Sequence, residues 1–251
     1  MPLIFIESLD LTYKVHYSEH QRIDDTDKPY YVNAYTASCT VPTQYKVFFS
    51  LCLFCGFRKG ETLALHWNDI DLKAKKISIS KSVGLTENGF AYKEPKTKNS
   101  VRNVSVPDDV ISLLEQYHKE YMRKRYQQGT AWKGEMYNGG NLFIQSDGKL
   151  MSPTTPYQYF IRHLRRYNEW VQNNPVKAKA ERLVELPVIP LHGLRHSCAT
   201  LLNYLGINIV EISKTLGHST CSTTMNIYAH SFEEQQEVIA SKVNMFIRMN
   251  A

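Results

Sequence analysis

The stretch that decides the fold is Gly56-Phe57-Arg58-Lys59-Gly60-Glu61, which stands inside an apolar region of the chain. Residues 41–65 carry apolar side chains at helical spacing, so the sequence predicts a helix here, with Thr43 as its N-cap and a break at Gly56. Beyond the break, Glu61 begins another turn or two of predicted helix. Arg58 is therefore expected at the junction between two helical segments.

Downstream of this junction the apolar pattern changes from helical to alternating. Residues 76–83 and 102–106 predict strands, and Asn88-Gly89 predicts a turn between them. Helical patterns return at Pro107, and a short strand is expected at 141–144. Further helices are predicted over 156–171, 192–205, 208–216, 222–229 and 232–248. The expected fold class is α+β, mainly α-helical, with a small antiparallel β-sheet.

The composition of the whole chain favours a polyanionic partner. The 251 residues carry a net charge of +6 and a pI of about 8.9, which is mildly basic. This length fits one large or two smaller domains. No stretch approaches the roughly 20 apolar residues of a membrane span, and residues 1–7 lack the charged head of a signal peptide. We therefore expect a cytoplasmic protein with no membrane partner.

Cys52 and Cys55 form a CxxC motif, which is found in zinc sites and redox sites. The pair lies in the apolar helical run, and no second cysteine or histidine pair has the spacing to complete four zinc ligands. Buried free cysteines behave as small hydrophobic side chains. The motif is therefore interpreted as part of the core, and no metal site is expected.

Three further motifs, far from Arg58 in the sequence, complete a set of polar residues suited to one reaction. They are His192-Gly193-Leu194-Arg195-His196, Leu216-Gly217-His218 and Ile227-Tyr228. Transesterification of a phosphodiester needs a nucleophile, cationic donors for the equatorial oxygens, a base for the nucleophile's proton and an acid for the leaving 5′-oxygen. Arginine suits the donor role because its planar fork pairs two phosphate oxygens and stays charged.

The motifs resemble the signatures of the tyrosine recombinases, the phage-integrase family. Residues 56–71 resemble the first signature, 191–200 the second, and 216–220 with 223–230 the third. The resemblance covers roughly residues 40–245. It implies a tyrosine-recombinase catalytic domain that cleaves and rejoins double-stranded DNA through a 3′-phosphotyrosyl intermediate, for the integration and excision of a mobile element or prophage.

The resemblance also implies a role for each matching residue. Tyr228, ten residues after His218, corresponds to the nucleophile. Arg58 and Arg195 correspond to the pair that clamps the scissile phosphate. His192 corresponds to the residue that assists proton transfer at the tyrosine, and His218 to a further hydrogen-bond donor to the phosphate.

Two more positions follow from the same resemblance. Glu61 corresponds to an acid behind the phosphate-binding groups that steadies the site. The general acid of the family is a lysine on a β-hairpin; Lys96 matches its Lys-Thr pattern, and Lys98 stays open as the alternative. His196 and His230 are interpreted as structural. For the arginines at 162, 165 and 166, a solvated helix face and a phosphate contact both stay open.

The implied reaction keeps the energy of the cleaved bond in the phosphotyrosine, so neither ATP nor a metal is expected. Nothing in the sequence resembles a P-loop, and no carboxylate cluster has metal-ligand spacing. The implied partners are double-stranded DNA, a tetramer of the chain on paired DNA sites, and an excisionase or a host architectural protein.

The organisation expected from the resemblance is a catalytic domain over residues 41–251. Residues 1–40 are expected to be an N-terminal extension or the remnant of a linker or core-binding region, because they are too few for a core-binding domain of the usual size. Two other functions stay open, strand relaxation of the type IB topoisomerase kind and a DNA-binding regulator that does not cleave. The DNA target, the host element and the choice among integration, excision and resolution are not given by the sequence.

Overall fold

The computed structural model describes residues 5, 8–10, 13–17, 20–23, 29–32, 35–87, 89–93, 101–218 and 225. Three predicted site residues, Lys96, its alternative Lys98 and Tyr228, lie outside the described residues. His230 and the helix predicted over 232–248 also lie outside the described residues. Of the helix predicted over 222–229, only residue 225 is described.

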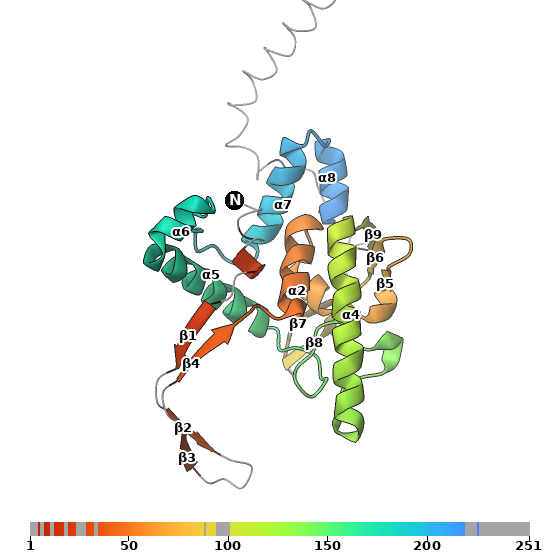
Figure 1. Cartoon of the computed structure of the whole chain (residues 1–251). Coiled ribbons are helices and arrows are strands. Elements are labelled where there is room, and N and C mark those ends of the chain that lie inside the picture. The colour runs from red at the N-terminus through yellow and green to blue at the C-terminus, as the bar shows by residue number, and fades with distance from the viewer. Residues whose placement is uncertain are drawn as a thin grey trace, which may run out of the picture.

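The apolar run forms α2, Thr43–Phe54, whose residues from Val47 to Leu53 are all buried. It packs against α4, Asp108–Gln128, and α7, Gly193–Tyr204, and occupies the middle of the molecule (Figure 1). The predicted cap is wrong, because Pro42 holds the N-cap position and the Thr43 hydroxyl donates to Glu120 of α4 at 2.8 Å. Thr43 therefore ties two helices together.

The predicted break at Gly56 is confirmed. Gly56 has a φ of +66°, and the short helix α3, Lys59–Leu63, follows it. A Cβ at position 56 would lie 2.3 Å from Cδ2 of Leu216 and 3.2 Å from Sγ of Cys198. Glycine is thus required at position 56 for two reasons. Its φ lies in the left-handed region, and α7 and α8, Ile209–Leu216, approach its backbone closely.

The predicted small antiparallel sheet is present, but the strands divide differently. β5, Ile70–Asp71, β6, Lys76–Ile79, and β9, Arg102–Ser105, form three antiparallel strands in the order β5-β6-β9. The single strand predicted over 76–83 is wrong, because the chain leaves β6 after Ile79 and starts a separate hairpin. That hairpin pairs β7, Ser82–Thr86, with β8, Gly89–Lys93, so the chain reverses between Thr86 and Gly89, next to the predicted turn.

The chain before α2 contains more regular structure than the one or two strands expected. β1, Tyr13–Tyr17, pairs with β4, Tyr35–Cys39, and β2, His20–Ile23, pairs with β3, Pro29–Val32. Both pairs are antiparallel and form two separate two-stranded sheets, which extend away from the helices (Figure 1).

The remaining elements are mostly helical, as predicted. α4 begins after Pro107 and buries one face against α2, with Tyr117 donating to the carbonyl of Leu142 at 2.7 Å. The predicted strand at 141–144 is reduced to two isolated bridges, His66 with Asn141 and Ile144 with Leu150. The rest of this part consists of η1 (Trp67–Asp69), η3 (Gly129–Ala131), η4 (Tyr137–Gly139), α5 (Thr155–Asn173) and α6 (Pro175–Ala180).

None of the helices in the described ranges is both long enough and apolar enough to cross a membrane.

We predict that Gly56→Ala lowers the free energy of unfolding by about 3 kcal/mol, because it adds a left-handed backbone penalty to a steric overlap with Leu216. Equilibrium unfolding in denaturant measures this change. Gly206→Ala is the matched control, since Gly206 has a φ of +78° but nothing within 4 Å of its added Cβ. The control should lose only about 1 kcal/mol. Equal losses in the two variants would contradict the proposed close approach at Gly56.

Candidate active site

The first part of the site is the turn from α2 into α3, where Arg58 and Glu61 bind one another. The backbone N–H of Arg58 donates to Oε2 of Glu61 at 3.0 Å, and Nη1 of Arg58 donates to Oε1 at 2.7 Å. The carboxylate therefore caps the helix and fixes the arginine at its start. The Arg58 side chain keeps 37% of its surface exposed, so it is accessible to a bound anion.

Arg195 approaches the same turn from α7 and is 2% exposed. Its Nη1 donates to the carbonyl of Gly56 at 2.5 Å, and its Nη2 donates to the carbonyl of Leu216 at 2.6 Å. Burial and, to a smaller extent, the charge of Arg58 lower the pKa of Arg195 to about 9, while Glu61 opposes the shift. The guanidinium is therefore charged at neutral pH and connects the ends of α2 and α8.

The end of α8 brings the third motif to the arginines. Gly217 caps this helix in the left-handed conformation, with φ +66° and ψ 45°, and its carbonyl accepts from Nη2 of Arg58 at 2.9 Å. The next residue, His218, donates its backbone N–H to Ser213 at 3.0 Å. Arg58 and Arg195 thus bind consecutive carbonyls, and His218 follows directly.

Both predicted site histidines favour the neutral form. Partial burial and the nearby charges of Arg195, Arg58 and Arg102 lower the pKa of His218 to about 4. Partial burial, His196 and Arg195 also lower the pKa of His192. Near neutral pH each ring therefore offers one N–H donor and one acceptor nitrogen.

Arg102 was not among the predicted site residues, but the structure places it beside Glu61. Its Nη2 donates to Oε2 of Glu61 at 2.9 Å and its Nη1 to Oε1 at 3.2 Å. In the sequence Arg102 is one of eight bases between positions 72 and 103, and nothing distinguishes it from the others. Its contact with Glu61 depends on the pairing of β9 with β6, which no local pattern reveals.

The carboxylate of Glu61 is ionised in this surrounding. Burial raises its pKa, but the hydrogen bonds and charges of Arg102 and Arg58 outweigh burial, and the pKa lies below its ordinary value. One negative charge therefore pairs with the guanidinium groups of Arg58 and Arg102, while the guanidinium of Arg195 binds only backbone carbonyls in the hydrogen bonds described. The excess positive charge suits an anion such as a phosphodiester.

The CxxC motif belongs to the core, as interpreted from the sequence. Cys52 and Cys55 are buried, free thiols, and burial raises the pKa of Cys52 to about 12. Within the part of the chain that the structure describes, no group of three or more His, Cys, Asp or Glu side chains could hold a metal ion.

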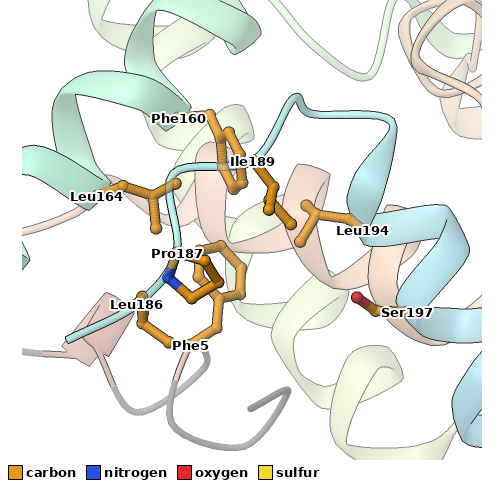
Figure 2. Close-up of a pocket in the computed structure, with 8 residues that line it drawn as sticks. All are labelled: Phe5, Phe160, Leu164, Leu186, Pro187, Ile189, Leu194 and Ser197. Carbon is orange, nitrogen blue, oxygen red and sulfur yellow. The ribbon is translucent and has the colours of Figure 1, made fainter. Parts of the chain in front are cut away.

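Two hollows lie along α5, and neither contains the predicted catalytic residues. A cavity of about 40 Å³ lies between α5 and α7 and has an apolar lining, shown in Figure 2 with Phe5, Phe160 and Leu194 around it. Such a lining offers no charged donor to a phosphate. An open groove of about 660 Å³ runs along α5 and is lined by Arg162, Arg165, Arg166 and four neighbours.

Comparisons with known proteins agree with the motifs. Residues 27–235 match the sequence model of the Phage integrase family. The chain is 28% identical over 202 residues to the ICEBs1 integrase of Bacillus subtilis, a match covering 80% of the chain and 48% of that protein. It is 27% identical over 208 residues to a XerC-like tyrosine recombinase of Caldanaerobacter subterraneus, covering 79% and 49%. The chain spans about half the length of these curated relatives.

Solved structures show the same fold. The Tn1549 transposon integrase in complex with transposon right end DNA matches with a TM-score of 0.64 and 23% identity, over 82% of this chain and 61% of that one. The XerA recombinase matches with a TM-score of 0.56 and 18% identity, over 80% and 57%. The mainly helical fold with small antiparallel sheets is thus the fold predicted from the sequence.

We predict that Glu61→Gln lowers the free energy of unfolding by about 3 kcal/mol at pH 7, because it leaves buried arginine charge without its partner. The folded-state pKa of Glu61 is depressed, so its stabilisation is complete above the ordinary carboxyl pKa of 4.5 and disappears as the pH falls through the folded value. The difference between wild type and variant should therefore shrink below about pH 4.5. Denaturant unfolding at a series of pH values measures it.

The control for this measurement is Glu115→Gln, which makes the same change at an exposed position of α4. It should alter stability by less than about 0.5 kcal/mol. A Glu61→Gln variant as stable as this control at pH 7 would show that the carboxylate does not hold the arginines.

Proposed function

Because the chain belongs to the phage integrase family, we propose that it is a site-specific DNA recombinase that cleaves and rejoins strands through a 3′-phosphotyrosyl bond to Tyr228. One observation carries the proposal: Arg58 and Arg195 converge from distant segments on the consecutive carbonyls of Leu216 and Gly217, directly before His218. This arrangement brings together two guanidinium groups and an imidazole, a set of donors that suits a phosphate.

In the proposed cleavage step, the hydroxyl oxygen of Tyr228 attacks phosphorus and the bond from phosphorus to the 5′-oxygen breaks. The tyrosine proton passes to His192, whose lowered pKa leaves an acceptor nitrogen near neutral pH. The leaving 5′-oxygen takes a proton from Lys96. Rejoining is the reverse, with a 5′-hydroxyl as nucleophile and Tyr228 as leaving group.

The negative charge that develops on the equatorial oxygens is stabilised by Arg58, Arg195 and His218. Arg195 is buried and held by two carbonyls, so it is already oriented before the phosphate binds. Arg58 is oriented by Glu61 and remains accessible. His218 is neutral and donates its N–H without adding charge.

The proposed substrate is double-stranded DNA from a mobile element or prophage. Relatives of the chain carry the names ICEBs1 integrase and integrase of Staphylococcus phage L54a. The Tn1549 integrase and the XerH recombinase have been solved bound to DNA. We accordingly propose that a tetramer of the chain integrates and excises this DNA at paired sites. An excisionase or an architectural protein would assist it. In a bacterial host, the compartment that holds this DNA is the cytoplasm.

We also propose that residues 41–251 form the catalytic domain and that residues 1–40 extend it. The positions of Arg58, Arg195 and His218 support this division, because all three lie after position 41. The match to the family begins at residue 27, within the extension.

The proposal predicts that the protein becomes covalently trapped on a nicked suicide DNA substrate carrying the ends of its element. Tyr228→Phe should form no covalent complex, because it lacks the attacking oxygen, yet it should bind the same DNA. Denaturing gel electrophoresis measures the trapped fraction. Tyr204→Phe, at an exposed position that ends α7, is the matched control and should trap DNA as well as wild type.

The outcomes of this assay separate the remaining functions. Wild type that never traps element-end DNA would contradict the recombinase, and DNA binding without trapping would favour the regulator. Relaxation of supercoiled DNA without recombinant products would favour the topoisomerase.

The same assay tests which lysine is the general acid. A sulfur in place of the leaving 5′-oxygen should rescue Lys96→Met, since a thiolate leaves without a proton. Rescue of Lys98→Met instead would move the general acid to Lys98.

A further inference from the structure

We propose that Arg102 is a positioning residue of this active site, which holds Glu61 and the end of α8 where they orient Arg58 and His218. The proposal rests on the function proposed above. Arg102 is the first residue of β9 and pairs with Ile79 of β6. Its side chain is 8% exposed, and its Nε, Nη1 and Nη2 all donate to protein oxygens, so it acts through these neighbours.

The first contact of Arg102 is a two-point grip on Glu61. Nη1 and Nη2 of Arg102 donate to the two different carboxylate oxygens, at 3.2 and 2.9 Å. Each of these oxygens also accepts from Arg58, Oε1 from its Nη1 and Oε2 from its backbone N–H. With Arg102 in place, the plane of the carboxylate is fixed from both sides, and so is the direction from which it holds Arg58.

The second contact of Arg102 reaches the third motif. Its Nε donates to the carbonyl of Thr215 at 2.8 Å, in the last turn of α8. A Cβ at position 217 would lie 2.7 Å from Nη1 of Arg102, so Gly217 gives the guanidinium room as well as ending the helix. The ring centroid of Phe57 lies 5.9 Å from Cζ of Arg102. The guanidinium therefore contacts the first motif and the third at once.

The geometry of these contacts requires an arginine. Three donor atoms of one planar group reach Glu61 and Thr215 in different directions. A lysine carries its donors on a single nitrogen and cannot span both oxygens of Glu61 and the carbonyl of Thr215 together. Charge alone should therefore restore only part of the function at this position.

Loss of Arg102 should make cleavage sensitive to acid. The hydrogen bonds and charge of Arg102 are the strongest influences that keep Glu61 ionised against its burial. Without them, Glu61 takes up a proton at higher pH, and a neutral carboxyl holds Arg58 less firmly. In the variant, the cleavage rate should fall at a pH where Glu61 becomes protonated. In wild type Glu61 is still ionised at that pH, so its protonation should not slow cleavage there.

The experiment compares wild type, Arg102→Met and Arg102→Lys in single-turnover cleavage of the suicide substrate from pH 5 to 8. We expect Arg102→Met to cleave about 100-fold more slowly at pH 7, as for a misplacement of about 1 Å at a reacting centre. It should slow further in acid and bind DNA with unchanged affinity. Arg102→Lys should have an intermediate rate. In a Glu61→Gln background, Arg102→Met should have little further effect, because the two residues act as a unit.

Arg123→Met, at an exposed position of α4, is the control and should cleave at the wild-type rate. Cleavage by Arg102→Met at the wild-type rate with an unchanged pH profile would overturn the proposal. A loss of DNA affinity as large as the loss of cleavage rate would also overturn it.

A ¹³C NMR titration of Glu61 tests the proposal without DNA. A raised pKa in both Arg102 variants supports it, and an unchanged pKa overturns it. If wild type traps no DNA, the proposed function fails, and the titration still decides whether Arg102 holds Glu61.

Discussion

The carboxylate of Glu61 places one negative charge between the guanidinium groups of Arg58 and Arg102, and the arrangement of the site depends on it. A buried ion pair of this kind contributes little net stability, because the desolvation of both charges offsets their attraction. Its consequence is geometric, since four hydrogen bonds fix the position of one carboxylate. Arg58 can then remain partly exposed and still point in one direction.

Two glycines allow the backbone to meet around this charge. Gly56 and Gly217 both have a φ of +66°, and a Cβ on either would overlap with a neighbouring side chain. Their close approach brings backbone carbonyls at the ends of α2 and α8 to Arg195 and Arg58. The arginines therefore connect three segments of the chain, and the glycines that surround them are part of the same site.

Much of the fold could be predicted from the sequence where the signal is local. The apolar periodicity of residues 43–54 corresponds to α2, the break at Gly56 follows it, and the predicted turn lies next to the reversal between Thr86 and Gly89. The motifs identified Arg58, Glu61, Arg195 and His218, which the structure brings together, because spacing within a motif is a property of the sequence. The catalytic roles predicted for these four residues, and for Lys96, His192 and Tyr228, remain predictions.

What the sequence did not predict depends on contacts between distant residues. Thr43 binds Glu120 instead of capping its helix, since α4 lies within reach of its hydroxyl. The strand expected over 76–83 divides because its second half pairs with β8 and not with β9. Arg102 was missed for the same reason, as its position next to Glu61 follows from the register of β9 on β6.

The most direct test of this account is a crystal structure of the Tyr228→Phe protein bound to an intact DNA site. The account predicts that the oxygens of the scissile phosphate accept hydrogen bonds from Arg58 and Arg195, with His218 beside them. Glu61 should lie between Arg58 and Arg102, as it does without DNA. A scissile phosphate bound away from both arginines, or a Glu61 carboxylate turned away from Arg58 in the complex, would contradict it.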